Sequence, residues 1–223
     1  MSRNPHILFL HGFGSGPGSQ KGVLIKDYFS TRGFSVALPS ISVPSLETLS
    51  PKAAVRSVMD ELSRLRGREV ILGGSSFGAF VALHAYASLT PTERPHIKAL
   101  VLLAPLIDPW DSKGGLLTPE REAAWKAQGT LAVMDLERGM DVGVHYRFVE
   151  ELRAFDSASV VVDVPTLIIH GRNDDVVPVA QSESFAARWG RVTLEVFDDG
   201  HQLLKEPDAL VRRIEEFLLL QSA

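Results

Sequence analysis

The chain has 223 residues, of which 45% are hydrophobic and 22% are charged, and its formal net charge is −4. This composition is typical of a globular domain and excludes collagen, coiled coils and long disordered segments. Because no strongly basic block is present, nucleic acid is not an expected partner. The longest apolar stretch, 99–107, is too short to cross a bilayer, so no membrane association is expected. The absence of cysteine and an early first strand, with no room for a secretory signal, favour a cytoplasmic location.

Short apolar runs alternate with longer stretches of helical periodicity, which is the pattern of βαβ units that build a parallel sheet. Six strands are predicted, at Ile7–Leu10, Ser35–Leu38, Glu69–Leu72, Lys98–Leu103, Thr166–His170 and Val192–Phe197. Five helices are predicted, at Lys21–Thr31, from Pro51 to just before Gly67, and at Phe77–Ser88, Val179–Trp189 and Pro207–Leu220. The sequence therefore predicts one α/β domain over 1–223, with a mostly parallel sheet and helices on both faces.

The segment 106–163 breaks this alternation, and no clear strand is predicted within it. Four aromatic residues stand among its charged side chains: Trp110, Trp125, Tyr146 and Phe148. A long insert between two sheet strands is more often a functional lid than a plain connection. We expect a lid whose aromatics, together with Phe80, line an apolar pocket for a substrate. The alternative is that these aromatics only anchor the insert to the core.

The sequence Gly74-Ser75-Ser76-Phe77-Gly78 matches the pattern G-x-S-x-G and joins the third predicted strand to the third predicted helix. Such a sharp turn holds its central residue in a strained backbone conformation, and the two glycines relieve the crowding around it. Ser76 is therefore the predicted nucleophile, because a frame centred on Ser75 would need glycine at position 77. The alternative is a Gly/Ser-rich turn without chemistry.

A serine hydroxyl needs a base to become a nucleophile, and the base needs an orienting carboxylate. Asp174 and His201 follow the fifth and sixth predicted strands. We predict that Asp174 orients His201, which gives the order Ser, Asp, His at the carboxyl ends of strands. Asp108 also follows a strand and is the alternative acid. His170 is expected to shape the turn that carries Asp174.

The loop His11-Gly12-Phe13-Gly14-Ser15-Gly16 follows the first predicted strand. Negative charge on an acyl oxygen needs preorganised donors, and the backbone N–H groups of Phe13 and Phe77 are predicted to supply them. A rival interpretation is a phosphate loop, since the segment is rich in glycine and precedes a helix that contains Lys21. The loop matches neither G-x-x-x-x-G-K-[ST] nor G-x-G-x-x-G, which argues against nucleotide binding.

With these motifs the chain resembles the α/β-hydrolase superfamily over nearly its whole length, and most of all its small bacterial serine esterases and acyl-thioesterase-like hydrolases. The run H-G-x-x-D-x-x-V-P from His170 to Pro178 adds to the elbow and the His-Gly loop. The resemblance implies a three-layer α/β-hydrolase fold with a small lid over the carboxyl edge of the sheet. Two departures, Ala79 where a second glycine is frequent and the bulky Phe77, bear on the shape of the pocket.

These observations predict a serine hydrolase that cleaves carboxylic ester or thioester bonds of a small-molecule substrate through an acyl-enzyme intermediate. Ser76 attacks, His201 transfers the proton, and Asp174 orients His201. Neither a metal nor a cofactor is needed for this chemistry. The alternatives are an amidase or C–C bond hydrolase with the same three residues, or a non-catalytic binding protein on this fold.

Overall fold

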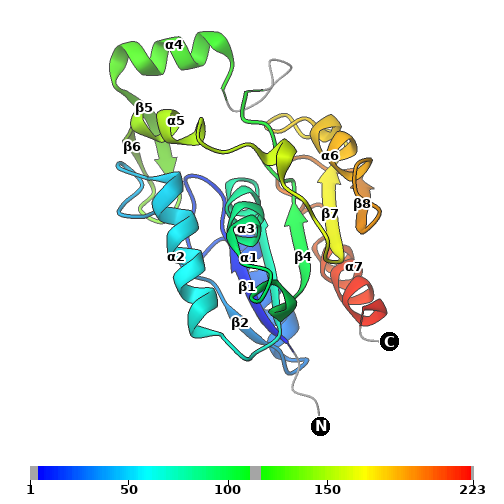
Figure 1. Cartoon of the computed structure of the whole chain (residues 1–223). Coiled ribbons are helices and arrows are strands. Elements are labelled where there is room, and N and C mark those ends of the chain that lie inside the picture. The colour runs from blue at the N-terminus through cyan, green and yellow to red at the C-terminus, as the bar shows by residue number, and fades with distance from the viewer. Residues whose placement is uncertain (1–4, 111–116, 222–223) are drawn as a thin grey trace.

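The computed structural model describes residues 5–110 and 117–221. At its centre lies a parallel sheet of six strands in the order β2-β1-β3-β4-β7-β8 (Figure 1). Its strands are β1 His6–Leu10, β2 Ser35–Ala37, β3 Val70–Ser75, β4 Ile97–Leu103, β7 Thr166–Gly171 and β8 Val192–Phe197. All six predicted sheet strands are present, although β3 extends to Ser75, three residues beyond the predicted end.

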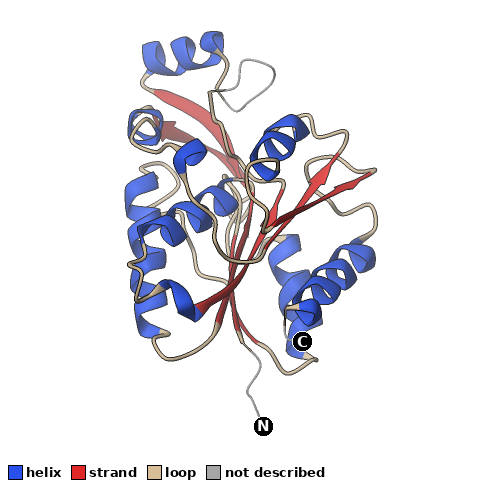
Figure 2. Cartoon of the chain, turned by 45° about the vertical axis from the view of Figure 1, so that its right-hand side comes forward, coloured by secondary structure: helices blue, strands red, loops and turns tan. Residues whose placement is uncertain are grey.

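Helices cover both faces of this sheet (Figure 2), which confirms the predicted three-layer α/β fold. On one face lie α1 Gln20–Ser30 and α7 Pro207–Leu220, and on the other lie α2 Pro51–Arg64, α3 Phe77–Ser88 and α6 Val179–Ala186. Alternate residues of a strand point to opposite faces. In β1, Ile7 and Phe9 join the apolar cluster that contains residues of α1 and α7, whereas Leu8 and Leu10 join the cluster on the other face.

The helix boundaries follow from local chemistry. Ser50 caps α2, because its hydroxyl accepts a hydrogen bond from the N–H of Ala53 at 3.1 Å, and Pro51 suits the first helical position. The helix α6 ends at Ala186, three residues before the predicted end at Trp189. Within the described residues, two short 3-10 helices lie in the connections, at Arg94–His96 and Ser157–Ser159.

The connection from β4 to β7 holds α4 Pro119–Gln128, the antiparallel hairpin of β5 Thr130–Asp135 and β6 Met140–His145, and α5 Arg147–Leu152. Figure 1 places α4, the hairpin and α5 above the carboxyl edge of the sheet. The prediction of no strand in 106–163 is therefore wrong. Of this segment, residues 111–116 lie outside the described part of the chain.

The sequence of the hairpin has an alternating pattern and a turn signal, although it contains no continuous apolar run. In β6 only Val142 and Val144 are buried, so the strand shows the period of two that a half-exposed sheet requires. In the turn, one carboxylate oxygen of Asp135 accepts hydrogen bonds from the N–H groups of Glu137 and Arg138, both at 3.0 Å. Gly139 then supplies the positive φ of 66° that closes the turn.

The order of the strands also marks a place for a ligand. The chain leaves β1 toward β2 on one side, whereas β3 pairs with the opposite side of β1. The loops that follow β1 and β3 therefore diverge, and open parallel sheets bind ligands in the crevice that such a reversal creates. None of the described helices combines the length and the apolar composition that a bilayer crossing requires.

Candidate active site

Ser76 occupies the turn between β3 and α3 with a φ of 55° and a ψ of −119°. A positive φ is uncommon for a residue other than glycine, and such strain gathers at functional positions. The N–H of Ser76 donates to the carbonyl oxygen of Leu103 at 2.9 Å, which ties the turn to the neighbouring strand β4. Ser75 is buried as the last residue of β3, with 4% of its surface exposed. Of the two serines, Ser76 is the more exposed.

The two glycines of the pattern are required by backbone packing. A Cβ atom on Gly74 would lie 2.4 Å from the carbonyl carbon of Gly78. A Cβ atom on Gly78 would lie 2.3 Å from the carbonyl oxygen of Leu10, at the end of β1. Side chains at these positions would push the first turn of α3 away from β1 and β3. The glycines thus allow the sharp turn that carries Ser76.

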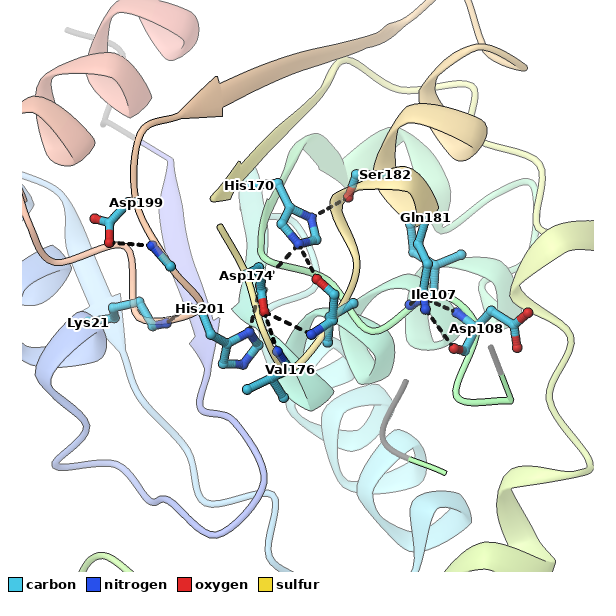
Figure 3. Close-up of polar contacts among 12 residues, drawn as sticks. Lys21, Ile107, Asp108, His170, Asp174, Val176, Gln181, Ser182, Asp199 and His201 are labelled. Carbon is cyan, nitrogen blue, oxygen red and sulfur yellow. Dashed lines mark hydrogen bonds and ion pairs between the residues drawn. The ribbon is translucent and has the colours of Figure 1, made fainter. Parts of the chain in front are cut away.

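Asp174 and His201 meet at the carboxyl ends of β7 and β8. The Nδ1 atom of His201 lies 2.8 Å from Oδ2 of Asp174 (Figure 3). An ionised carboxylate only accepts hydrogen bonds, so Nδ1 carries the proton and the Nε2 atom of His201 keeps its lone pair. The Asp174 side chain is fully buried, whereas 12% of the His201 side chain is exposed.

The other carboxylate oxygen of Asp174 is also held. Its Oδ1 accepts hydrogen bonds from the N–H groups of Val176 and Val177, both at 2.8 Å. Burial raises the pKa of Asp174, but hydrogen bonds from His170, His201 and the Val177 N–H outweigh it and hold this pKa well below its usual range. Asp174 is therefore ionised at neutral pH.

His170, which is fully buried, completes this network (Figure 3). Its Nε2 atom lies 2.9 Å from the carbonyl oxygen of Val177 and 3.1 Å from Oδ2 of Asp174, and both of these atoms are acceptors. The proton of neutral His170 is therefore on Nε2, and Nδ1 accepts from the hydroxyl of Ser182 at 2.7 Å. His170 thus bridges the two ends of the turn that carries Asp174, as its place in the sequence predicts.

The loops of Asp174 and His201 pack backbone against backbone. A Cβ atom on Gly171 would lie 2.4 Å from the carbonyl oxygens of both Asp199 and Gly200. Asp108, the alternative acid, is directed elsewhere: its carboxylate accepts from the N–H of Trp110 at 2.9 Å, and the side chain is exposed. The structure thus brings Asp174, and not Asp108, against His201.

The His-Gly loop approaches Ser76 from β1. A Cβ atom on Gly12 would lie 3.6 Å from Cβ of Ser76. His11 anchors the loop, because its Nε2 accepts from the N–H of Ile41 at 3.0 Å and its Nδ1 lies 2.9 Å from the Gly12 carbonyl oxygen. Burial lowers the pKa of His11, which suits the neutral ring that these bonds require. Phe77 is the first residue of α3, where backbone N–H groups have no acceptor within the helix.

A cavity of about 700 Å³ lies where these loops converge. Its lining comes from the His-Gly loop, the first turn of α1, the Ser76 turn, the hairpin turn and the His201 loop: Gly12, Phe13, Ser15, Gly16, Gly18, Ser19, Gln20, Lys21, Ser75, Ser76, Leu136, Glu137, His201 and Gln202. Ser76 and His201 therefore line one cavity, with Asp174 buried behind His201. Among the described residues, no group of His, Asp and Glu side chains is arranged to hold a metal ion.

The five aromatics predicted to form an apolar pocket do not line this cavity. Phe80, Trp125 and Phe148 are buried in the core, where Trp125 stacks on Phe148 and donates its indole N–H to the carbonyl oxygen of Val144 at 2.8 Å. The hydroxyl of Tyr146 donates to Glu122, and the ring of Trp110 lies beneath the guanidinium of Arg153. These aromatics anchor the insert, as the alternative interpretation states, because burial of a large ring is a strong source of stability.

Two charged residues of the cavity were not predicted as site residues. Lys21, in the first turn of α1, is 7% exposed, and its Nζ donates to the carbonyl oxygen of His201 at 3.1 Å. Burial lowers its pKa to about 8, although the carboxylates of Asp174 and Asp199 act in the opposite direction. Glu137, in the hairpin turn, accepts from the N–H of Gly18 at 3.5 Å. Lysine in a helix and glutamate in a turn are common surface residues, so no local pattern indicates that either lines the cavity.

The sequence of this chain matches a known protein family over most of its length. The model of an uncharacterised protein family, UPF0227, matches residues 6–218. The chain belongs to this family. Over 196 residues it is 26% identical to the human mitochondrial palmitoyl-protein thioesterase ABHD10, a match that covers 83% of this chain and 62% of the relative. The chain thus spans less than two thirds of the length of that relative.

Solved structures of other proteins share the fold of this chain. Est1E from Butyrivibrio proteoclasticus, with ferulic acid bound, has a TM-score of 0.79 and 19% identity, covering 98% of this chain and 90% of its own. The mouse alpha/beta hydrolase domain-containing protein 10 has a TM-score of 0.78 and 20% identity, covering 98% and 91%. The α/β-hydrolase fold expected from the motifs is thereby confirmed. The predicted cytoplasmic location stays a prediction, and the human relative is named as mitochondrial.

Proposed function

We propose that this protein is a serine hydrolase that cleaves carboxylic ester or thioester bonds. The observation that carries the proposal is the hydrogen bond of 2.8 Å between His201 and Asp174, beside a serine in a strained turn that lines the same cavity as His201. A nucleophile, a base and an orienting acid are the three parts that acyl transfer by a serine requires. Their combination is hard to explain by structural need alone, because the strain at Ser76 costs stability.

The reaction proceeds in two stages. The Oγ atom of Ser76 attacks the carbonyl carbon while Nε2 of His201 takes its proton, and the resulting imidazolium gives this proton to the departing alcohol or thiol. The acyl group is then an ester of Ser76. Water, deprotonated by His201, attacks this ester, and the proton returns to Oγ as the acid is released. Asp174 keeps its charge throughout and stabilises the imidazolium.

The backbone N–H groups of Phe13 and Phe77 donate to the oxyanion of each tetrahedral intermediate. The close approach of Gly12 to Ser76 supports this role, because it brings the loop after β1 to the reacting serine. Phe77 adds the N–H that directly follows the nucleophile, as in other nucleophile elbows. Donors fixed in the backbone need no rearrangement during the reaction.

The cavity lining indicates the kind of substrate. Apart from Ser75, Ser76 and His201, six of the lining side chains are polar or charged: Ser15, Ser19, Gln20, Lys21, Glu137 and Gln202. This wall favours an ester whose acyl or leaving group carries polar atoms over one with a long apolar chain. Leu136 and Glu137 belong to the β5–β6 turn, so the hairpin of the insert 106–163 acts as the lid. The name of the human relative adds support for thioesters as well as esters.

The test is steady-state hydrolysis of p-nitrophenyl esters and acyl-CoA thioesters by the wild type, Ser76→Ala and Ser75→Ala. We expect Ser76→Ala to lower kcat by about 10³-fold or more, whereas Ser75→Ala keeps most of the activity. An equal loss in both variants would place the nucleophile elsewhere. A wild type that cleaves p-nitroanilides faster than every ester would favour the amidase alternative.

A further inference from the structure

Lys21 is a buried cation that the proposed reaction does not use. It is the second residue of α1, and its ammonium group lies against the backbone of His201, 180 positions later in the sequence (Figure 3). Only 7% of its surface is exposed. A lysine is almost never buried without a partner, because removal of its charge from water is costly. The burial of Lys21 therefore lowers the stability of the folded protein, which indicates that the contact has another use.

The contact fixes one specific atom. The Nζ atom of Lys21 donates to the carbonyl oxygen of His201 at 3.1 Å, so it restrains the peptide that bears the imidazole. The other hydrogen bonds described for this loop come from the C-terminal half of the chain. The N–H of Gly200 donates to the carboxylate of Asp199 at 2.7 Å, and the N–H of Asn173 donates to the Asp199 carbonyl oxygen at 3.0 Å. Lys21 alone among these contacts links the His201 loop to α1 and the wall of the cavity.

The charges around this contact define its electrostatic effect. The carboxylates of Asp174 and Asp199 face Lys21 from the ends of β7 and β8, and Glu137 lines the same cavity from the hairpin. His201 is likewise bordered by Asp174, with Lys21 on its carbonyl side. The carboxylates of Asp174 and Asp199 attract the ammonium group and help to hold it beside the loops that carry Asp174 and His201.

We propose that Lys21 is a positioning residue for the histidine base: its ammonium group holds the carbonyl of His201 and keeps the imidazole aligned with Ser76. This role rests on the proposed hydrolase function. A base displaced by 1 Å can lose about 100-fold in rate, so one restraint on the His201 peptide is enough to matter. Because Lys21 acts on the base, its loss changes kcat rather than KM.

The experiment compares Lys21→Met, Lys21→Arg and the matched control Lys26→Met with the wild type, using p-nitrophenyl acetate. Lys26 lies on the same helix and is exposed. In Lys21→Met we expect kcat to fall roughly 10- to 100-fold with KM within twofold. Lys21→Arg recovers most of kcat, because its guanidinium also donates hydrogen bonds to a carbonyl oxygen, and Lys26→Met behaves as the wild type.

Two results would overturn the role of Lys21. One is a Lys21→Met variant with wild-type kcat. The other is a loss of kcat without recovery in Lys21→Arg, which would show that Lys21 only supports α1. Should Lys21→Met not fold, Lys21→Gln, shorter and uncharged, is measured in the same way. Labelling of the wild type by a fluorophosphonate at Ser76 separates the two proposals, because only a failure of the hydrolase proposal abolishes this adduct.

Discussion

Replacement of Gly171 by alanine perturbs the contact between the loops of Asp174 and His201 without touching either side chain. The added Cβ would lie 2.4 Å from the carbonyl oxygens of Asp199 and Gly200, whereas ordinary contacts of a Cβ begin at 3.4 Å. The His201 loop must therefore retreat by about 1 Å, because β7 is buried and cannot yield. Such a displacement of the base lowers kcat by about 100-fold. Overpacking at this site also costs roughly 1–3 kcal/mol of unfolding free energy.

Hydrolysis of p-nitrophenyl acetate and urea denaturation measure the two effects of Gly171→Ala. Gly190→Ala is the matched control, because a Cβ on this exposed glycine meets no described atom within 4 Å. We expect the control to keep the wild-type kcat. A Gly171→Ala variant that folds and keeps kcat within about threefold of the wild type would refute the claim that this backbone contact sets the position of His201.

Three further predictions concern the acid, the buried lysine and the insert. Asp174→Asn should lower kcat by about 10⁴-fold in a folded protein. The Val176 and Val177 N–H groups fix the amide oxygen and turn the amide N–H₂ toward His201, so the imidazole proton lies on Nε2 and this atom no longer acts as the base. Pre-steady-state acylation measures this loss. The pKa of Lys21 is lowered from 10.5 to about 8, so its burial costs about 3 kcal/mol below pH 8 and this cost disappears as pH rises toward 10.5. Urea denaturation of the wild type should therefore show a gain in stability between these values that Lys21→Met lacks. Trp125→Ala should cost about 3–5 kcal/mol yet leave the acyl-length profile of ester hydrolysis unchanged, because Trp125 packs in the core.

The sheet and most helix boundaries could be predicted from the sequence because their signals are local. The buried strands β3, β4 and β7 are mostly apolar runs, and Ser50 followed by Pro51 predicts the start of α2. The hairpin was missed because its strands are half exposed. In β6, Val142 and Val144 alternate with Asp141 and Gly143, a pattern too short and too polar to stand out without the turn that follows Asp135.

The residues of the candidate site likewise divide into those with a local sequence signal and those without one. Ser76, Asp174 and His201 can be predicted as candidates because each follows a strand, and the carboxyl ends of parallel strands share one edge. The aromatic pocket was misplaced because the sequence does not tell which face of a helix or turn meets the core. Lys21 was noted only as part of a rival phosphate loop. Its contact with His201 joins residues 180 positions apart, and no local pattern reports such a contact.

The central claim, that Ser76 is an activated nucleophile, is tested most directly by mass spectrometry of the protein after reaction with a fluorophosphonate. We expect one adduct on the peptide that contains Ser76, at a rate that falls by several orders of magnitude in His201→Ala, since the neutral hydroxyl alone is a weak nucleophile. Ser76→Ala should take up no label there, and Ser75→Ala should react as the wild type does. An adduct that persists in Ser76→Ala, or a wild type that never reacts, would contradict the account.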